Sequence, residues 1–436
     1  MFRRLLVSLA TLLFSTALFA QSAPSDVEQR LRALEERVAA MQKAAPTVDF
    51  SEIQREIDVL SKEIETLKAG GEKKVASADV TSAGLGAAAS KIYRTQSGLA
   101  FGGYGEFLYQ NFDAPGRAST ADALRAILYT GYKFNDRVLF NSEIEYEHAN
   151  TERTGEVEVE FAYLDFLVRP EMNVRAGLLL MPVGLTNENH EPTAYIGARR
   201  PIVDSRIIPT TWMELGGGVY GDVGTVTYRG YVTTGFNSTA FTATGIRGGR
   251  QLGSQAKADD LSVVGRVDWH PIEGAMVGGS LYTGGSGQEQ SFTGRVTIAE
   301  GHAQARLRGF DLRALYARGT IGDAAAINAQ NKLVGAASVG ERFGGWYVEG
   351  AYDVLGLFGN RGERSLSPYA RIERLNTQQR VPAGFLVNRA NDQKIFTLGL
   401  AFKPMSQTVV KVDWQKVDNR ANTGVDQFNV ALGYIF

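Results

Sequence analysis

The sequence contains no cysteine in 436 residues. This absence excludes disulfides, thiolate zinc sites, iron–sulfur clusters and cysteine nucleophiles. An excess of one charge is also missing, because 46 Lys and Arg stand against 47 Asp and Glu, for a formal net charge of -1. The balance argues against a basic nucleic-acid binder and against an acidic disordered tail.

Long hydrophobic runs are absent after the first 20 residues. Residues 1–20 begin with Arg3 and Arg4, continue with an apolar stretch and end at the small residue Ala20. This order is typical of a secretory signal peptide. The alternative is a membrane anchor, which the stretch is too short to favour, since a span needs about 20 apolar residues. We therefore expect an exported protein without a transmembrane helix.

Residues 21–68 carry an apolar repeat. Its spacing of four and three residues is the a/d pattern of a coiled coil, and Pro46 divides it into two short stretches. The apolar positions are Val27, Leu31, Leu34, Val38 and Met41, then Ile53, Ile57, Leu60, Ile64 and Leu67. Such short helices need a partner, so we expect a trimer or, alternatively, a hairpin folded back at Pro46. Residues 69–97 are rich in Ala, Gly and Ser and predict a flexible linker.

The remainder, residues 98–436, predicts β-structure. The chain is rich in glycine and in tyrosine and phenylalanine, with 49, 17 and 22 copies. Apolar and polar residues alternate, most clearly from Phe428 to Phe436. A soluble sandwich and a membrane barrel both show this period of two. Strands of about 10–13 residues, aromatic residues near strand ends, and alternating short and long connections favour the barrel.

The connections set the number of strands. Short turns are expected at Asn135-Asp136, Pro170-Glu171, Asp222-Val223, 270–274, Arg308-Gly309, 357–363 and 404–407. Long connections are expected after Phe112, Ala149, Gly184, Phe236, Gly284, Ile321, Thr377 and Asp418. A closed single-chain barrel needs an even number of strands, so a candidate strand at 332–342 is assigned to a loop. The fold class is thus all-β transmembrane, a closed antiparallel barrel of about 16 strands, with 18 as the alternative. A barrel of this size encloses a water-filled channel.

Two stretches resemble the phosphate-selective porin O/P family of outer-membrane proteins. One runs from Phe161 to Pro170, and the other from Val174 to Leu185 contains a Gly-x-x-x-x-Pro-x-Gly element at Gly177, Pro182 and Gly184. Residues 211–222, 367–374 and 398–404 resemble the family too. The resemblance implies an outer-membrane porin of a Gram-negative bacterium, some of whose relatives carry an N-terminal coiled coil and form trimers. Tyr434 and Phe436 resemble the signal that the barrel assembly machinery recognises.

The inferred lumen wall departs from the family's basic ladder, because acidic residues oppose the basic ones. Lumen candidates are Arg125, Arg175, Arg229, Arg266, Arg313, Arg371, Lys411, Glu143, Glu145, Glu158 and Glu160. This mixture argues against phosphate selectivity. For the glutamate rows we expect balance by arginines across the barrel, with cation binding as the alternative.

The longest internal connection, residues 186–210, is expected to form the constriction. It contains Arg199, Arg200 and Arg206 together with Glu188, Glu191 and Asp204. Folded into the lumen, adjacent arginines present guanidinium donors to anions. The alternative is that these arginines pair with the acids of the loop or of the wall.

No enzyme motif is present. The four histidines lack metal-ligand spacing, and no Gly-x-Ser-x-Gly or phosphate-cradling loop occurs. We expect no catalytic residue, no metal and no cofactor. The sequence predicts a homotrimeric porin in the outer membrane, with its coiled coil in the periplasm, through which small hydrophilic solutes diffuse with a weak preference for anions. The alternatives are a channel specific for dicarboxylates or sugars, and a non-conducting structural or adhesive barrel.

Overall fold

The computed structural model describes residues 83–152, 154–359 and 362–436. The expected signal peptide, the coiled coil and the linker up to residue 82 lie outside these residues. No helix in the described part of the chain is long and apolar enough to cross a membrane.

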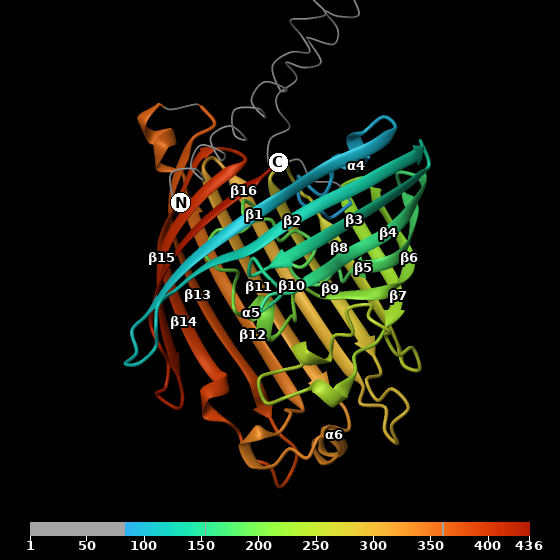
Figure 1. Ribbon diagram of the computed structural model, residues 1–436, viewed down its shortest axis with the longest axis vertical. Helices are drawn as coiled ribbons and strands as arrows, with labels where there is room; N and C mark the ends of the chain where they lie inside the picture. Colours follow the sequence, from blue (N-terminus) through green and yellow to red (C-terminus); the bar gives the residue numbers. More distant parts are fainter. Residues whose placement is uncertain (1–82, 153, 360–361) are drawn as a thin grey trace, which may run out of the picture. The chain divides into compact units, whose positions relative to one another are not determined.

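Sixteen antiparallel strands form one closed barrel, as the sequence predicts, and each strand pairs with its neighbours in the chain (Figure 1). The strands are β1 Gly98–Phe112, β2 Thr120–Asn135, β3 Val138–Glu147, β4 Val157–Arg169, β5 Met172–Leu180, β6 Met213–Val223, β7 Val226–Thr234, β8 Leu261–Trp269, β9 Ala275–Gly284, β10 Val296–Leu307, β11 Phe310–Ile321, β12 Arg342–Tyr352, β13 Ser365–Arg380, β14 Asp392–Met405, β15 Thr408–Asn419 and β16 Gln427–Ile435. The short helices are α4 Lys91–Arg94, α5 Val203–Arg206 and α6 Ala324–Gln330.

The seam between the first and last strands closes the barrel. Tyr104 of β1 stands opposite Ile435 of β16, and the pairing continues to Phe112 opposite Gln427. The backbone N–H of Phe436 donates to the carbonyl of Gly103, and the N–H of Gly103 donates to the carbonyl of Phe436, at 2.9 and 3.1 Å. Closure leaves no unpaired edge strand, which is the condition for a sheet that stands in lipid.

Side chains alternate between the two faces of the wall, and β8 shows the pattern clearly. Val263 and Val267 are more than half exposed on the outside, whereas Arg266 and Asp268 are buried on the inside. The other strands repeat it, with large apolar side chains outside and charged or polar ones inside. This distribution is the reverse of the one in a water-soluble protein. There, apolar surface is kept inside, since each Å² left in water costs about 25 cal/mol.

Short turns join most strands at one end of the barrel and longer loops join them at the other, as expected. The connection between β12, which ends at Tyr352, and β13, which begins at Ser365, is the exception, because it contains the 3-10 helix η4 Val354–Phe358 and is longer than the turn expected at 357–363. The turn between β6 and β7 lies two residues later than predicted, because Val223 still pairs with Val226 and Gly224 makes the bend. The φ of Gly224 is +60°, in the left-handed region that glycine tolerates best. Residues 332–341 belong to the connection between β11 and β12, as predicted, and contain the 3-10 turn η3 Gly335–Ala337.

Residues 83–97, here called the leading segment, correct one expectation. The sequence predicts a flexible linker, but Leu85, Ala88 and Ser90 are buried and α4 follows them. The side-chain amide of Asn141 on the inner face of β3 donates to the carbonyl of Ala89 at 3.1 Å. The small side chains that suggested flexibility allow the backbone to pack close to the inner wall.

Candidate functional site

The connection between β5 and β6, residues 181–212, lies inside the barrel and is here called the inner loop. Its apolar side chains Met181, Val183, Ile207, Ile208 and Trp212 are fully buried. They join one hydrophobic cluster with inward-facing residues of the wall. The barrel therefore has its apolar core in the lumen, built around a loop.

A single asparagine closes the base of the inner loop. The Asn187 amide donates to the carbonyls of Met181 and Trp212 at 2.8 and 2.9 Å, and its oxygen accepts from the N–H of Trp212 at 2.8 Å. These bonds satisfy backbone groups that no strand pairs. Asn187 thus holds the two ends of the loop together where the chain leaves the wall.

Side chains from the far wall bind the backbone of the inner loop. Lys411 donates to the carbonyl of Tyr195 at 2.8 Å, and Asp413 accepts from the N–H of Ala198 at 2.9 Å. Glu373 accepts from the N–H of Val203 at 3.3 Å. The loop starts from β5 and reaches β13 and β15, so it crosses the lumen.

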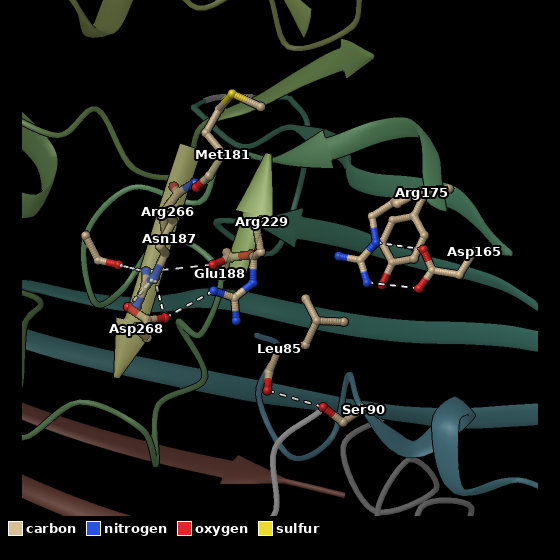
Figure 2. A network of polar contacts seen from close by, with 12 residues as sticks. Leu85, Ser90, Asp165, Arg175, Met181, Asn187, Glu188, Arg229, Arg266 and Asp268 are labelled. Atoms are coloured by element: carbon tan, nitrogen blue, oxygen red, sulfur yellow. Dashed lines mark hydrogen bonds and ion pairs between the residues drawn. The ribbon is translucent and has the colours of Figure 1, made fainter. Parts of the chain in front are cut away.

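The three acidic candidates of the loop are used in internal contacts. The Glu188 carboxylate lies 3.3 Å from Arg229 and 3.7 Å from Arg266, beside Asp268 (Figure 2). Glu191 accepts hydrogen bonds from the N–H groups of Ala88 and Ala89 in the leading segment. Burial raises the pKa of Glu191, although these backbone bonds oppose the shift.

Asp204, the third acid, lies fully buried in α5. Its Oδ2 accepts from the Thr186 hydroxyl at 2.8 Å and from the Tyr347 hydroxyl at 3.4 Å. Burial raises the pKa of Asp204 to about 7, although the bond from Thr186 opposes the shift. The carboxyl is therefore poised to lose its proton near neutral pH.

The three arginine candidates of the loop differ from the three acids in their contacts. Within the described residues, Arg199, Arg200 and Arg206 form no ion pair within 4.0 Å. Arg199 and Arg200 are half-buried, and Arg206 is exposed. Arg200 donates to the carbonyl of His190 at 3.3 Å. Their guanidinium groups are thus the cationic part of the inner loop.

The lumen candidates of the wall all lie on its inner face, and most are paired. Arg175 binds Asp165 through two hydrogen bonds, a pair seen in Figure 2. Further ion pairs join Arg371 to Glu373 and Glu349, Arg313 to Asp311 and Glu349, and Arg125 to Glu106 and Glu145. Glu143 and Glu160 contact His190, and Glu158 is half-buried.

The connection between β7 and β8, residues 235–260, is a second inward loop, here called the mouth loop. Its Phe236 ring stacks on Trp212 with ring centroids 4.7 Å apart. The carbonyl of its Ala243 accepts from Thr377 and from Asn391 near the start of β14. The mouth loop therefore passes from β7 to the far side of the barrel at its long-loop end.

The mouth loop adds two arginines that the sequence analysis missed. Arg247 is repelled by Arg250 and Arg200 and attracted by Glu147, and Arg250 attracts Glu158. Basic groups of two loops thus face the acidic row of β3 and β4. No local signal marks these residues, because their position depends on where a long loop folds.

The leading segment supplies a further group at the opposite, short-turn end. The Tyr93 hydroxyl donates to Asp165 at 2.5 Å and accepts from Arg175 at 2.7 Å, and Tyr220 donates to Asp165 at 2.7 Å. A cavity of about 860 Å³ lies beside this network. Its lining includes Tyr93, Glu188, Tyr220, Arg229, Arg266 and Asp268. Charged and polar side chains of the wall, the inner loop and the leading segment thus line one cavity at the short-turn end.

His190 of the inner loop touches two carboxylates of the wall. Its Nε2 lies 3.2 Å from Glu143 and 2.8 Å from Glu160. Burial lowers the pKa of His190, but Glu160 and Glu143 outweigh it and raise the pKa to about 10. The sequence spacing does not predict that these three side chains meet, since His190 lies 47 positions from Glu143.

Comparison with known proteins places the chain beside an uncharacterized protein of Aquifex aeolicus. The two are 35% identical over 366 residues, which cover 81% of this chain and 84% of that protein. No model of a known protein family matches the chain.

Solved structures resemble it less closely in sequence. OmpF of Salmonella typhi, in complex with daunomycin, has a TM-score of 0.51 at 13% identity and covers 79% of this chain and 99% of its own. In-vitro folded OmpT of Vibrio cholerae, an outer membrane protein in trimer form, has a TM-score of 0.49 at 10% identity and covers 78% and 100%. The likeness to OmpF shows a porin-like barrel fold.

Proposed function

The chain belongs to the same family as that Aquifex aeolicus protein, and we propose that it is an outer-membrane porin. Small hydrophilic solutes diffuse passively through its lumen, and the inner loop sets their selection. The observation that carries this proposal is the reversed wall, apolar outside and charged inside. An apolar exterior suits lipid, and a charged interior suits water and polar solutes.

A weak preference for anions follows from the pairing of charges inside. The acids of the inner loop are used in contacts with the wall or the leading segment, whereas Arg199, Arg200 and Arg206 make no ion pair among the described residues. Guanidinium groups at a narrowing attract anions and repel cations. The paired wall favours a general anion preference over the phosphate selectivity of the O/P family.

The membrane setting completes the proposal. Tyr434 and Phe436 both point outward and stack with ring centroids 6.4 Å apart, which suits recognition by the barrel assembly machinery. We place the barrel in the outer membrane of a Gram-negative bacterium as a homotrimer, with the predicted coiled coil in the periplasm.

Single-channel recording in planar bilayers tests the function. Under a KCl gradient, we expect conductance in three steps and a reversal potential that favours anions. Arg199→Ala combined with Arg200→Ala should reduce the anion bias, because it removes two of the three unpaired cations of the loop. Arg364→Ala, in an exposed turn, is the matched control and should leave the bias unchanged.

A non-conducting structural barrel is the second candidate. The leading segment, the inner loop and the mouth loop all occupy the lumen, and this filling is the observation that favours it. Complete absence of conductance from folded protein would decide for this candidate. A current that saturates and is blocked by succinate or a sugar would instead support a substrate-specific channel.

A further inference from the structure

Three side chains meet where the inner loop touches the wall, and together they have the composition of a metal site. The Nε2 atom of His190 lies 3.2 Å from Glu143 Oε1 on β3 and 2.8 Å from Glu160 Oε2 on β4. All three side chains are at most 2% exposed. They are the one group of three acidic or histidine donors found to converge within 4.8 Å in the described residues.

The other nitrogen of His190 orients the ring. Nδ1 lies 2.9 Å from the carbonyl oxygen of Asn187, in the loop's own closing turn. A carbonyl only accepts hydrogen bonds, so Nδ1 carries a proton and donates it. In the metal-free protein Nε2 carries a second proton, which faces the two carboxylates, and a bound ion would take the place of that proton. Metal-binding histidines are commonly held by this kind of backbone contact.

Four buried polar atoms at the site have no hydrogen bond. Among the described residues these are Glu143 Oε2, both carboxylate oxygens of Glu160 and the Tyr104 hydroxyl, although Glu143 and Glu160 are 0% and Tyr104 1% exposed. Glu160 Oε2 keeps only its 2.8 Å ion-pair contact with His190. The Tyr104 ring lies edge-on to His190, with centroids 6.2 Å apart. Buried polar groups in folded proteins normally find partners, and a group left without one in a protein is often a ligand of an ion.

The charges around the site are also unequal. Glu145 stands between Glu143 and the rim of the same strand and interacts with Glu160, and the nearest arginine contact is Arg125, 3.6 Å from Glu145. Arg125 is shared with Glu106 at 3.3 Å. Four carboxylates, those of Glu106, Glu143, Glu145 and Glu160, thus share two cationic groups within 4.0 Å among the described residues, His190 and Arg125, and this excess favours a bound cation.

We propose that Glu143, Glu160 and His190 bind one divalent transition-metal ion of the zinc class. A tetrahedral ion with bonds of about 2.0–2.2 Å holds its ligand atoms about 3.3 Å apart. The 3.2 Å between His190 Nε2 and Glu143 Oε1 is close to this value, whereas Glu160 Oε2, at 2.8 Å, would have to move outward by about 0.5 Å to become a ligand. Three protein ligands leave one coordination position open. The imidazole ligand argues against Ca²⁺ and Mg²⁺, which prefer oxygen ligands.

The bound ion fastens the inner loop to the wall. His190 belongs to the loop, whereas Glu143 and Glu160 belong to adjacent strands, so the ion joins elements that are distant in the sequence. The inference does not depend on conduction, because metal binding is measured on the protein in solution.

Calorimetric titration of the full chain in detergent tests the site. The protein is freed of metal with a chelator and titrated with ZnCl2, and we expect one ion for each chain. His190→Gln and Glu143→Gln should each weaken binding at least ~100-fold, since each removes a direct ligand. Glu143→Asp keeps the charge but shortens the ligand, so its affinity should lie between those of the wild type and Glu143→Gln.

His302→Gln is the matched control. His302 is also buried between two carboxylates, but Glu300 contacts its Nδ1 and Asp268 its Nε2, so the acids lie on opposite sides of the ring. This variant should bind zinc like the wild type. Absence of stoichiometric zinc binding in the folded wild type would overturn the proposal. So would full affinity in folded His190→Gln, or an equal loss in His302→Gln.

Discussion

Arg371 illustrates how single residues are accommodated in this lumen. Its guanidinium is fully buried, with Nε 2.8 Å from Glu373 and Nη1 3.3 Å from Glu349. A buried charge of this kind is tolerated only when it is paired and hydrogen-bonded. Arg199 and Arg200 lie on the inner loop without an ion pair in the described residues. This contrast separates wall arginines that are held by ion pairs from inner-loop arginines that are not.

Asp204 should make stability depend on pH. Its folded pKa of about 7 lies above the ordinary value of 3.8. A carboxyl whose pKa rises on folding stabilises the folded state below pH 4, and this contribution is lost as pH rises through about 7. The difference between the two pKa values is equivalent to at most about 4 kcal/mol. Asp204→Asn imitates the neutral acid, so the loss of stability between pH 5 and pH 8 should be smaller in this variant.

Chemical unfolding midpoints in detergent, followed by tryptophan fluorescence at both pH values, measure the effect. Asp136→Asn is the control, because the Asp136 side chain is 97% exposed in a turn. It should keep the pH dependence of the wild type. An identical pH dependence in Asp204→Asn would mean that the buried carboxyl stays ionised in the folded protein.

At the scale of elements, one apolar side chain anchors the leading segment. Ile92 of α4 is 1% exposed and packs with Ala100 and Leu139 of the inner wall. A β-carbon added at Gly131 on β2 would lie 2.8 Å from Ile92, so the glycine makes room for it. Apolar packing therefore holds the short helix α4 against the wall.

Ile92→Asp should release the leading segment and increase the single-channel conductance. Burying an unpaired carboxylate in this apolar contact costs several kcal/mol of free energy. Displacement of the leading segment from the wall avoids this cost, because the introduced carboxylate then lies in water. Ile272→Asp in the turn between β8 and β9 is the control, because Ile272 is 57% exposed. Wild-type conductance from folded Ile92→Asp protein would indicate that the segment does not obstruct the passage.

The strands were predictable from the sequence because their signal is local. Alternation along β8 or β16 reports which face each residue occupies, and turn residues mark where strands end. The contents of the lumen were harder to foresee. Glu191 meets Ala88 across 103 positions of the chain, and His190 meets Glu143 across 47. Neither periodicity nor composition encodes such distant contacts.

The leading segment was misread for a related reason. Small residues are common in flexible linkers, but here they fit a narrow space inside the barrel. A β-carbon at Gly86 would lie 2.3 Å from the Glu191 carboxyl group, so glycine at this position leaves room for Glu191 to bind the leading segment. A segment rich in small residues can therefore be either a flexible linker or a tightly packed segment, and only the residues around it decide which.

At the scale of the whole molecule, selectivity should depend on salt. The net charge of -1 gives no long-range attraction for anions, so the bias must come from local groups in the lumen. Salt screens charges over about 10 Å at 0.1 M and about 3 Å at 1 M. Reversal potentials under equal KCl ratios should thus show a weaker anion bias near 1 M than near 0.1 M.

The variant lacking Arg199 and Arg200 provides the comparison for this measurement. Its smaller bias should change less with salt, because the charges that salt screens are gone. A bias that is unchanged between the two concentrations in the wild type would point to the width of the passage, rather than charge, as the source of selection.

The seam between β1 and β16 has a consequence for biogenesis. During synthesis β1 is complete long before β16 exists, so the ring of strands cannot close until β16 has been made. The leading segment and the inner loop end up within the ring that this last pairing shuts. Their insertion must therefore either precede closure or proceed through an end of the finished cylinder. The timing of the final strand decides which route is open.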